Sequence, residues 1–458
     1  MKKPILIFWL ILFSLFSYAQ TLDEALLREI KGSFVRDPQN IALQNILTGD
    51  ADISRNAMNR AVQGKIDHFF KYRVTVKGIT NQYSSGRCWM FASMNALRPV
   101  VRELLQTEDF DFSHSYVYFW DLLEKSNLFL ENIIQTAERD IDDREVTVYF
   151  STPINDGGVW SLFYNVAEKY GVVPESVMPE SEHSKNSRQM VSVIKERLRA
   201  GGYSLREMYS RGADAEGLRR EKKAILKDVY RVLSLCLGDP PAEFLYRYKN
   251  REGQIISMKT TPLEFYRSII SSDYSPSSYI MIMNDPTREY YRMYELRNYR
   301  NTVEGINWIY LNLPNDEIKA AALSSIKDNE PMYTSCDVGK YFDKESGILD
   351  PDNYDYQSLL GINLQMDKKA RILTGQSSSS HAMLLIGCDT DQDDKPVKWE
   401  FENSWGKNNG NGGYLTFTDK WFDEYMFRFV IHKKHLSPKA IAALSKDPVL
   451  LPVWDHMF

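Results

Sequence analysis

The chain has 458 residues, enough for one large domain or two to three ordinary ones at roughly 100–200 residues per domain. Apolar residues make up 43% of the chain and charged residues 26%, which is the composition of a globular protein with a sizeable core. The formal net charge of −5 argues against a general nucleic-acid binder, and four cysteines are too few for a disulfide-stabilised scaffold.

The first residues are typical of a secretory signal peptide. Two lysines precede an apolar run from Ile5 to Phe16, and Ser17 and Ala19 are small residues at the −3 and −1 positions of a cleavage site. The apolar run is short for a membrane span, although a retained N-terminal anchor is the alternative. We predict that residues 1–19 are removed, and that the mature protein is secreted or periplasmic with no stable membrane span.

A candidate nucleophile follows a polar segment with helical patterns at residues 20–80. The loop Asn81–Gly86 leads into apolar residues at helical spacing from Cys88 to Leu104, interrupted by Pro99. Cys88 is therefore expected at a helix N-terminus, where unpaired backbone N–H groups and the helix dipole lower the pKa of a thiol. A structural thiol can occupy the same place, so this signal is weak alone.

The middle of the chain contains a glycine loop and a long charged region. The loop Thr152–Trp160 includes Gly157 and Gly158 and leads into a predicted helix at residues 161–170. Residues 182–330 are rich in charge and tyrosine, with helical patterns at 188–200 and 215–237, and we interpret them as a mainly helical insertion.

Strand patterns return late, at residues 381–387, 398–403 and 413–418. His381 begins the first of these strands and Asn403 ends the next. If the two strands are adjacent, the Asn403 amide oxygen can accept a hydrogen bond from the imidazole and fix its tautomer, with Trp405 covering that bond. Helical patterns early and strands late indicate an α+β fold.

The oxyanion partner is predicted from the loop before Cys88. The side-chain amide of Gln82 could join the backbone N–H of Cys88 in binding a developing oxyanion. Taken singly, Gln82 could be a turn residue, His381 a core histidine and Asn403 a turn cap. The order glutamine, cysteine, histidine, asparagine along the chain is more specific than any one of these residues.

Metal-ligand spacings and phosphate loops are missing from the sequence, so no metal and no cofactor are expected. The remaining cysteines are interpreted as buried, inert thiols whose pairing stays open: Cys236, Cys336 and Cys388.

These segments resemble the papain superfamily, and in particular its bleomycin hydrolase / aminopeptidase C branch. The resemblance covers nearly the whole mature chain and rests on the stretches ITNQYSSGRCWMFA, INDGGVW, YGVVPESVMPES, SCDVGKYF, SSHAMLLIG, FENSWG and LLPVWDHMF. It implies a papain-like cysteine peptidase fold. The N-terminal arm and helical half would span 20–181, a large helical insertion 182–330, a β half with the histidine and asparagine 331–440, and a C-terminal arm towards the cleft 441–458.

The resemblance also implies roles for the candidate residues. Cys88 would be the nucleophile, His381 the general base, Asn403 the orienting residue and Gln82 the oxyanion amide. Gly157 and Gly158 match the family's glycine loop, which would bind the backbone of a peptide substrate. The resemblance further implies a homohexamer that hydrolyses peptides as an aminopeptidase. The branch is usually cytosolic, so export is expected from the signal peptide alone, and the absence of a nucleic-acid partner is expected from the net charge.

Three alternatives remain open at this stage. Relatives carry a few more residues at the end of an arm that lies in the cleft, so an arm ending at Phe458 would leave more of the cleft accessible and favour endopeptidase activity or oligopeptide trimming. A non-catalytic, oligomeric nucleic-acid-binding scaffold that kept the fold is the second alternative. Transfer of the acyl group to an amine instead of water is the third.

Overall fold

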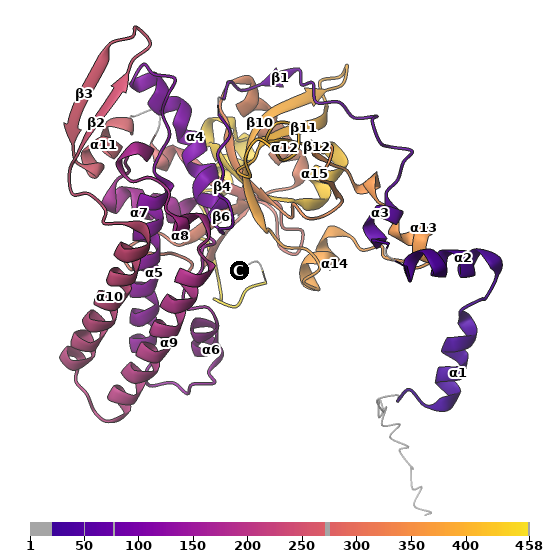
Figure 1. Ribbon diagram of the computed structural model, residues 1–458, viewed down its shortest axis with the longest axis horizontal. Helices are drawn as coiled ribbons and strands as arrows, with labels where there is room; N and C mark the ends of the chain where they lie inside the picture. Colours follow the sequence, from indigo (N-terminus) through magenta and orange to yellow (C-terminus); the bar gives the residue numbers. More distant parts are fainter. Residues whose placement is uncertain (1–20, 50, 77, 271–274, 457–458) are drawn as a thin grey trace, which may run out of the picture.

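The computed structural model describes residues 21–456 except 50, 77 and 271–274. The predicted signal peptide and Phe458 therefore lie outside the described residues. A bundle of long helices forms one half of the molecule and a large twisted sheet forms the other (Figure 1). In the described part of the chain, none of the helices has the length and apolar character needed to cross a bilayer.

The N-terminal segment forms an arm of short helices. Aspartates at positions 23 and 37 accept hydrogen bonds from backbone N–H groups at the starts of α1 and α2, as N-caps do. Neither helix has a buried residue, and α1 lies away from both halves (Figure 1). The elements of the arm are α1 (Glu24–Ser33), α2 (Pro38–Leu47), α3 (Ile53–Ala57) and the short strand β1 (Tyr72–Arg73).

The helical half is built around α4 and α5. Apolar side chains from α5, α7, α9 and α10 form one continuous core with the buried face of α4. The elements of this half are α4 (Cys88–Leu104), α5 (His114–Gln135), α6 (Arg144–Ser151), α7 (Trp160–Tyr170), α8 (Glu182–Lys185), α9 (Arg188–Ser210), α10 (Ala215–Leu237), the hairpin β2 (Phe244–Lys249) and β3 (Ile255–Thr260), and α11 (Pro262–Ile269).

The helix α4 begins at Cys88, as its sequence predicts. It runs without a break through Pro99, although a proline inside a helix removes one hydrogen bond. Leu97, Arg98 and Val101 are buried on either side of the proline, so packing holds the two parts of the helix in line.

The strands of the sheet lie in the order β14-β5-β6-β4-β13-β7-β10-β11-β12-β9-β8, with β1 beside the far end of β10. Their bounds are β4 (Tyr279–Met283), β5 (Arg292–Leu296), β6 (Trp308–Asn312), β7 (Met332–Cys336), β8 (Phe342–Asp343), β9 (Ile348–Leu349), β10 (His381–Thr390), β11 (Pro396–Glu402), β12 (Tyr414–Thr418), β13 (Met426–His432) and β14 (Val449–Leu451). The predicted strands at 381–387 and 398–403 are neighbours and antiparallel, with Leu384 opposite Glu402.

The two faces of the sheet contact different layers. One face packs against the helical half, with Ala382 and Val430 in the shared core. The other face packs against helices that follow or interrupt the strands. These elements are α12 (Asn315–Lys327), α15 (Asp419–Tyr425) and α16 (Pro438–Ala443). Two further helices are α13 (Tyr356–Leu360), which contacts α3, and α14 (Lys368–Leu373), whose Ile372 belongs to the core of the helical half.

The structure differs from the predicted insertion after Leu237. Helices fill residues 182–237 as expected, but β4, β6 and β5 extend the sheet from residue 279 onward. The short apolar run Tyr279–Met283 is the signal for the first of these strands, and its last three residues are buried. The sheet half therefore begins before residue 331, and residues 182–330 contribute to both halves.

A buried ion pair joins the two halves beside the cleft. Nη2 of Arg98, on α4, lies 2.8 Å from Oε1 of Glu402, at the end of β11, and both side chains are almost fully buried. The Asn95 amide donates to the same carboxylate at 2.9 Å, and Arg98 also pairs with Asp111 at 3.2 Å. Because a buried charge is costly without its partner, this contact fixes how α4 sits on the sheet.

Replacing Arg98 with Met removes the main counterion of the buried Glu402. Burial already raises the pKa of Glu402 to about 7, compared with 4.5 for an ordinary glutamate, and Arg98 opposes that rise. Without Arg98 we expect the free energy of unfolding at pH 8 to fall by about 3–5 kcal/mol. A carboxyl with a folded-state pKa above its unfolded-state value destabilises the fold as the pH rises between the two values. The loss should therefore be smaller at pH 5 than at pH 8, as measured by urea unfolding.

Two further variants separate charge from packing. Arg98→Lys keeps a positive charge and should lose less stability than Arg98→Met at pH 8. The double variant Arg98→Met, Glu402→Gln removes both charges and should recover part of the loss. A double variant as unstable as Arg98→Met alone would show that packing, and not the ion pair, holds the two halves together.

Candidate active site

The candidate site is centred on Cys88, the first residue of α4. Arg87 occupies the N-cap position and makes no side-chain capping bond, so the first N–H groups of α4 are not taken by a capping side chain. Such N–H groups, together with the helix dipole, attract negative charge. Cys88 is half-buried and is not in a disulfide.

His381 and Asn403 lie side by side, as the adjacency of β10 and β11 requires. Nε2 of His381 is 2.8 Å from Oδ1 of Asn403, and both residues are buried. The ring of Trp405 stacks on the imidazole with 4.6 Å between centroids, so it covers this bond. An amide oxygen accepts, so Nε2 carries the proton and Nδ1 of the neutral ring is an acceptor.

The thiol of Cys88 lies beside the start of β10. The backbone N–H of Ala382, the residue after His381, lies close enough to the sulfur to lower the pKa of the thiol, as do those of Trp89 and Cys88 itself. This contact places the nucleophile candidate next to the base candidate, across the boundary between the two halves.

Burial opposes charge on each of the two groups. It raises the pKa of the Cys88 thiol, although the backbone N–H groups and the positive charge of Arg428 lower it. Burial also lowers the pKa of His381 to about 4, while the bond to Asn403 raises it. Each group alone therefore favours its neutral form, and a thiolate can form only with its proton placed close by, on the imidazole.

Gln82 ties the loop before Cys88 to the segment after Asn403. Its Oε1 accepts from Ser404 Oγ at 2.6 Å, and its Nε2 donates to the Ser85 backbone oxygen at 2.6 Å. Its backbone N–H donates to the Ser404 oxygen at 2.8 Å. These contacts fix the amide while one of its two N–H groups stays available for a further acceptor.

Gly158 lies against the residue that follows the nucleophile candidate. A Cβ atom on Gly158 would lie 2.7 Å from the indole ring of Trp89, a distance that side chains do not tolerate. Glycine is therefore required there because of close approach. Gly157 and Gly158 are both accessible to solvent, and α7 begins two residues later.

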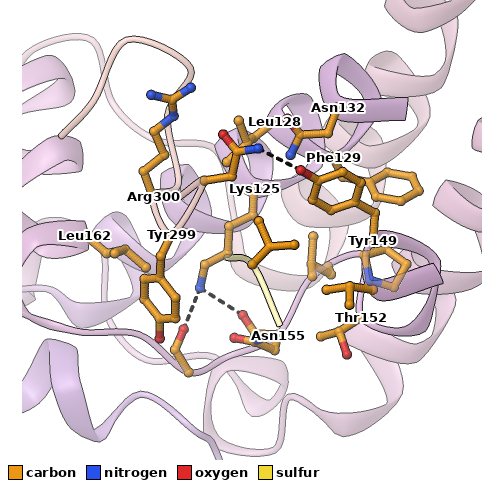
Figure 2. Close-up of a pocket in the computed structure, with 16 residues that line it drawn as sticks. Lys125, Leu128, Phe129, Asn132, Tyr149, Thr152, Asn155, Leu162, Tyr299 and Arg300 are labelled. Carbon is orange, nitrogen blue, oxygen red and sulfur yellow. Dashed lines mark hydrogen bonds between the residues drawn. The ribbon is translucent and has the colours of Figure 1, made fainter. Parts of the chain in front are cut away.

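A cavity of about 100 Å³ lies behind this loop (Figure 2). Its walls come from α5, α6, the loop before Gly158 and the segment around Tyr299, and Val453 of the C-terminal arm also lines it. The arm is held by β14, which pairs with β5, and by Trp454, whose ring lies 4.6 Å from the Arg144 guanidinium carbon. The described part of the arm therefore runs to the loop that contains Gly157.

One of the three remaining cysteines differs from the prediction that all of them are buried, inert thiols. Cys336 and Cys388 are buried free thiols, whereas Cys236 is only half-buried and also free. One possible metal-ligand group lies in the described residues: Asp328, Glu330 and His435 hold their ligand atoms within 4.8 Å of one another. The Lys434 ammonium lies 2.6 Å from Glu330 and 3.2 Å from Asp328, so these carboxylates already have a cation.

Two charged residues near the cleft were not singled out by sequence reasoning. Arg428 is a single charge in the buried strand Met426–His432, and Lys125 is the only lysine in α5. A lone charge inside an otherwise apolar strand is a signal that could have identified Arg428, whereas Lys125 shares α5 with three acidic residues and has no such signal. Arg428 stacks on Trp308 at 4.1 Å and lies opposite Ser335, which in turn lies opposite Ala382.

Comparison with known proteins agrees with this arrangement. A model of the Peptidase C1-like family matches residues 21–458. The human protein bleomycin hydrolase is 36% identical over 431 residues, which cover 92% of this chain and 94% of that protein. Aminopeptidase C of Streptococcus thermophilus is 36% identical over 91% of this chain and 94% of its own length. Aminopeptidase G of Lactobacillus delbrueckii subsp. lactis is 34% identical over 96% of this chain and its full length.

A solved structure has the same fold. The crystal structure of PepW from Lactobacillus rhamnosis superimposes with a TM-score of 0.90 at 33% sequence identity, covering 95% of this chain and 98% of that one. The helical half and the sheet half are thus arranged as in that protein.

Arg428 provides a test of the electrostatics around Cys88. Replacing it with Gln removes a buried positive charge that lowers the pKa of the thiol. We expect the pH midpoint of Cys88 alkylation by iodoacetamide to move up by about one unit, so that the rate well below the midpoint falls about tenfold while the rate on the high-pH plateau stays unchanged. Stopped-time mass spectrometry of the Cys88 peptide measures both rates, and Arg428→Lys should stay close to the wild type. Equal slowing below the midpoint and on the plateau, with an unmoved midpoint, would indicate altered access and not altered charge.

Proposed function

Because this chain belongs to the Peptidase C1-like family and is a papain-like cysteine peptidase, we propose that it hydrolyses peptide bonds with Cys88, His381 and Asn403. The observation that carries this proposal is the buried His381–Asn403 bond of 2.8 Å, placed at the strand start whose next N–H contacts the Cys88 sulfur. Nothing else in the described residues combines a nucleophile, a base and an orienting amide in this way.

The proposed reaction follows from which atoms are occupied. Asn403 holds Nε2 of His381, so Nδ1 is the ring atom that exchanges a proton with Cys88. The thiolate attacks the peptide carbonyl carbon, and a sulfur–carbon bond forms while the carbonyl oxygen becomes negative. The Cys88 N–H and the Gln82 amide donate to that oxygen. The imidazolium then gives its proton to the leaving amine, and the carbon–nitrogen bond breaks.

The second half of the reaction uses the same base. His381, neutral again, takes a proton from a water molecule that attacks the thioester. The carbon–sulfur bond breaks, the acid product leaves and the thiol is restored. Because burial lowers the pKa of His381 to about 4, the imidazole is available as a base at neutral pH.

We further propose that the enzyme removes residues from the N-terminus of peptides and acts outside the cytoplasm. Relatives named aminopeptidase C and aminopeptidase G, and the approach of Val453 to the loop of Gly157, support trimming from one end. The sequence of residues 1–19, with its two lysines, apolar run and small residues, supports export.

Two versions of one peptide test the proposed activity. We expect the mature protein with a reductant to release single residues from a peptide with a free N-terminus, and to leave the same peptide intact when it is acetylated. Mass spectrometry of the products gives the cleavage positions directly. Internal cleavage of both peptides would replace aminopeptidase with endopeptidase activity.

The nucleophile variant is the control for this experiment. Cys88→Ser keeps the size of the side chain but replaces the thiolate with a much weaker nucleophile, and it should lose hydrolysis of both peptides. Cys236→Ser alters the other half-buried thiol and should cleave at the wild-type rate. Retained hydrolysis in Cys88→Ser would contradict the proposed mechanism. An added amine that appears in the product would indicate acyl transfer.

We also propose that the mature chain assembles into a homohexamer, to which its N-terminal arm contributes. Several apolar side chains of the arm are exposed in a single chain, although soluble proteins usually cover such clusters. They are Leu22, Leu27, Ile30, Phe34, Val35, Ile41 and Ile46. The helices α1 and α2, which bury none of their residues, are stable folded elements only with a partner surface.

Removing the arm tests this assembly. Sedimentation equilibrium should give a hexamer mass for the mature chain and a smaller assembly for a chain that starts at residue 51. A variant with Ile30 and Ile46 changed to Ser should behave like the truncated chain, and one with the exposed Arg28 and Gln44 changed to Ser should behave like the mature chain. A monomer at all concentrations would contradict the proposal.

A further inference from the structure

The turn before Gly158 is held by all three of its carbonyl oxygens. Lys125 Nζ donates to the oxygen of Asn155 at 2.9 Å and to that of Gly157 at 2.7 Å, as Figure 2 shows. Between them, the oxygen of Asp156 accepts from Trp89 Nε1 at 2.7 Å. Three consecutive backbone acceptors in an accessible turn therefore point towards the protein interior.

Lys125 is placed for this task by its surroundings. It projects from α5, its side chain is 10% exposed, and its ammonium forms an ion pair with Asp121 at 2.7 Å. An ammonium has three N–H donors, and these three oxygens match them in number. Asp121 in turn accepts from the Asn301 amide at 2.9 Å, so the lysine cannot move without disturbing a buried network.

The orientation of one carbonyl sets the orientation of the next N–H. The peptide bond between Gly157 and Gly158 is trans, and in a trans peptide the C=O and N–H bonds point in opposite directions. Since Lys125 holds the Gly157 oxygen, the N–H of Gly158 points away from Lys125. No hydrogen bond links this N–H to another residue in the described part of the chain, and Gly158 is partly open to solvent.

We propose that Lys125 is a positioning residue for substrate: it fixes the Gly157–Gly158 peptide so that the Gly158 N–H donates to a backbone carbonyl of the bound peptide. This inference rests on the proposed substrate-binding role of Gly157 and Gly158. Lys125 touches neither the substrate nor Cys88 in this arrangement. Its effect is confined to ligands that have a peptide backbone.

Two alkylating reagents separate this role from a general effect on the thiol. An iodoacetyl-dipeptide amide carries backbone carbonyls that can pair with Gly158 and has no residue on the N-terminal side of its reacting carbon, whereas iodoacetamide has the same alkylating group and no peptide backbone. For Lys125→Met we expect the rate constant for labelling of Cys88 by the peptidyl reagent to fall about tenfold, the worth of one good hydrogen bond. The rate constant for iodoacetamide should stay unchanged.

The matched control is Lys222→Met. Lys222 also forms an ion pair with a carboxylate of α5, Glu131, but it contacts no carbonyl oxygen of the turn. This variant should keep both rate constants. Lys125→Arg keeps the charge and several donors and should restore most of the peptidyl rate.

Amide exchange of the 155–160 segment reports the position of the turn without activity. We expect faster exchange there in Lys125→Met, and wild-type exchange in Lys222→Met. If Lys125→Met fails to fold, Lys125→Gln, which can still donate to one carbonyl, takes its place with a smaller fall in the peptidyl rate. A Lys125 variant that folds and labels at the wild-type rate with both reagents overturns the inference. A wild-type Cys88 that never reacts with the peptidyl reagent overturns the proposed function itself, and this inference with it.

Discussion

The contact between Arg98 and Glu402 is the interaction on which the geometry of the candidate site depends, because the proposed reacting groups come from two separate halves. Cys88 begins α4, and Arg98 lies further along the same helix. Glu402 ends β11, and Asn403 follows it directly. The helix is therefore held to the sheet at two points, by the Cys88 sulfur beside the Ala382 N–H and by this buried ion pair. Since a charge buried without its counterion is costly, neither end can slide, and the distance between Cys88 and His381, the proposed nucleophile and base, is kept.

The helix α4 lacks a side-chain cap at its first turn. Ser113 and Asp214 cap α5 and α10 with side-chain oxygens, but Arg87 provides no such bond at the start of α4. A missing cap costs about 1 kcal/mol. The uncapped backbone N–H groups of this turn lie beside the sulfur, where the proposed reaction forms an oxyanion. The buried surroundings favour neutral Cys88 and neutral His381, so these donors and the charge of Arg428 are what make a thiolate attainable.

Sequence patterns predicted the elements that carry the candidate site, but they missed the strands β4 to β6 and the roles of Lys125 and Arg428. Cys88 at a helix start, His381 at a strand start and the adjacency of the next strand follow from short-range periodicity, which is strong for buried segments. The strands β4 to β6 were missed because β4 and β6 are short apolar runs inside a charged region and β5 itself contains Arg292 and Glu295, so that pairing with distant strands decides their structure. Lys125 and Arg428 could not be assigned roles from sequence, because their partners are backbone atoms and residues far away in the chain.

The helices α9 and α10 support the candidate site through α5, and Ser187 at the N-cap of α9 also donates to the Asp156 carboxylate. Both pack against α5, whose buried residues line most of its length. That helix presents Lys125 to the carbonyl oxygens of the turn at residues 155–157, and Tyr118 to the Asp156 carboxylate at 2.8 Å. The Asp156 carboxylate also accepts from the Gly86 N–H at 3.2 Å, two residues before Cys88. Because α5 is enclosed on several sides, it is a rigid support. By packing against α5, the helices α9 and α10 stabilise both the loop before Cys88 and the turn before Gly158.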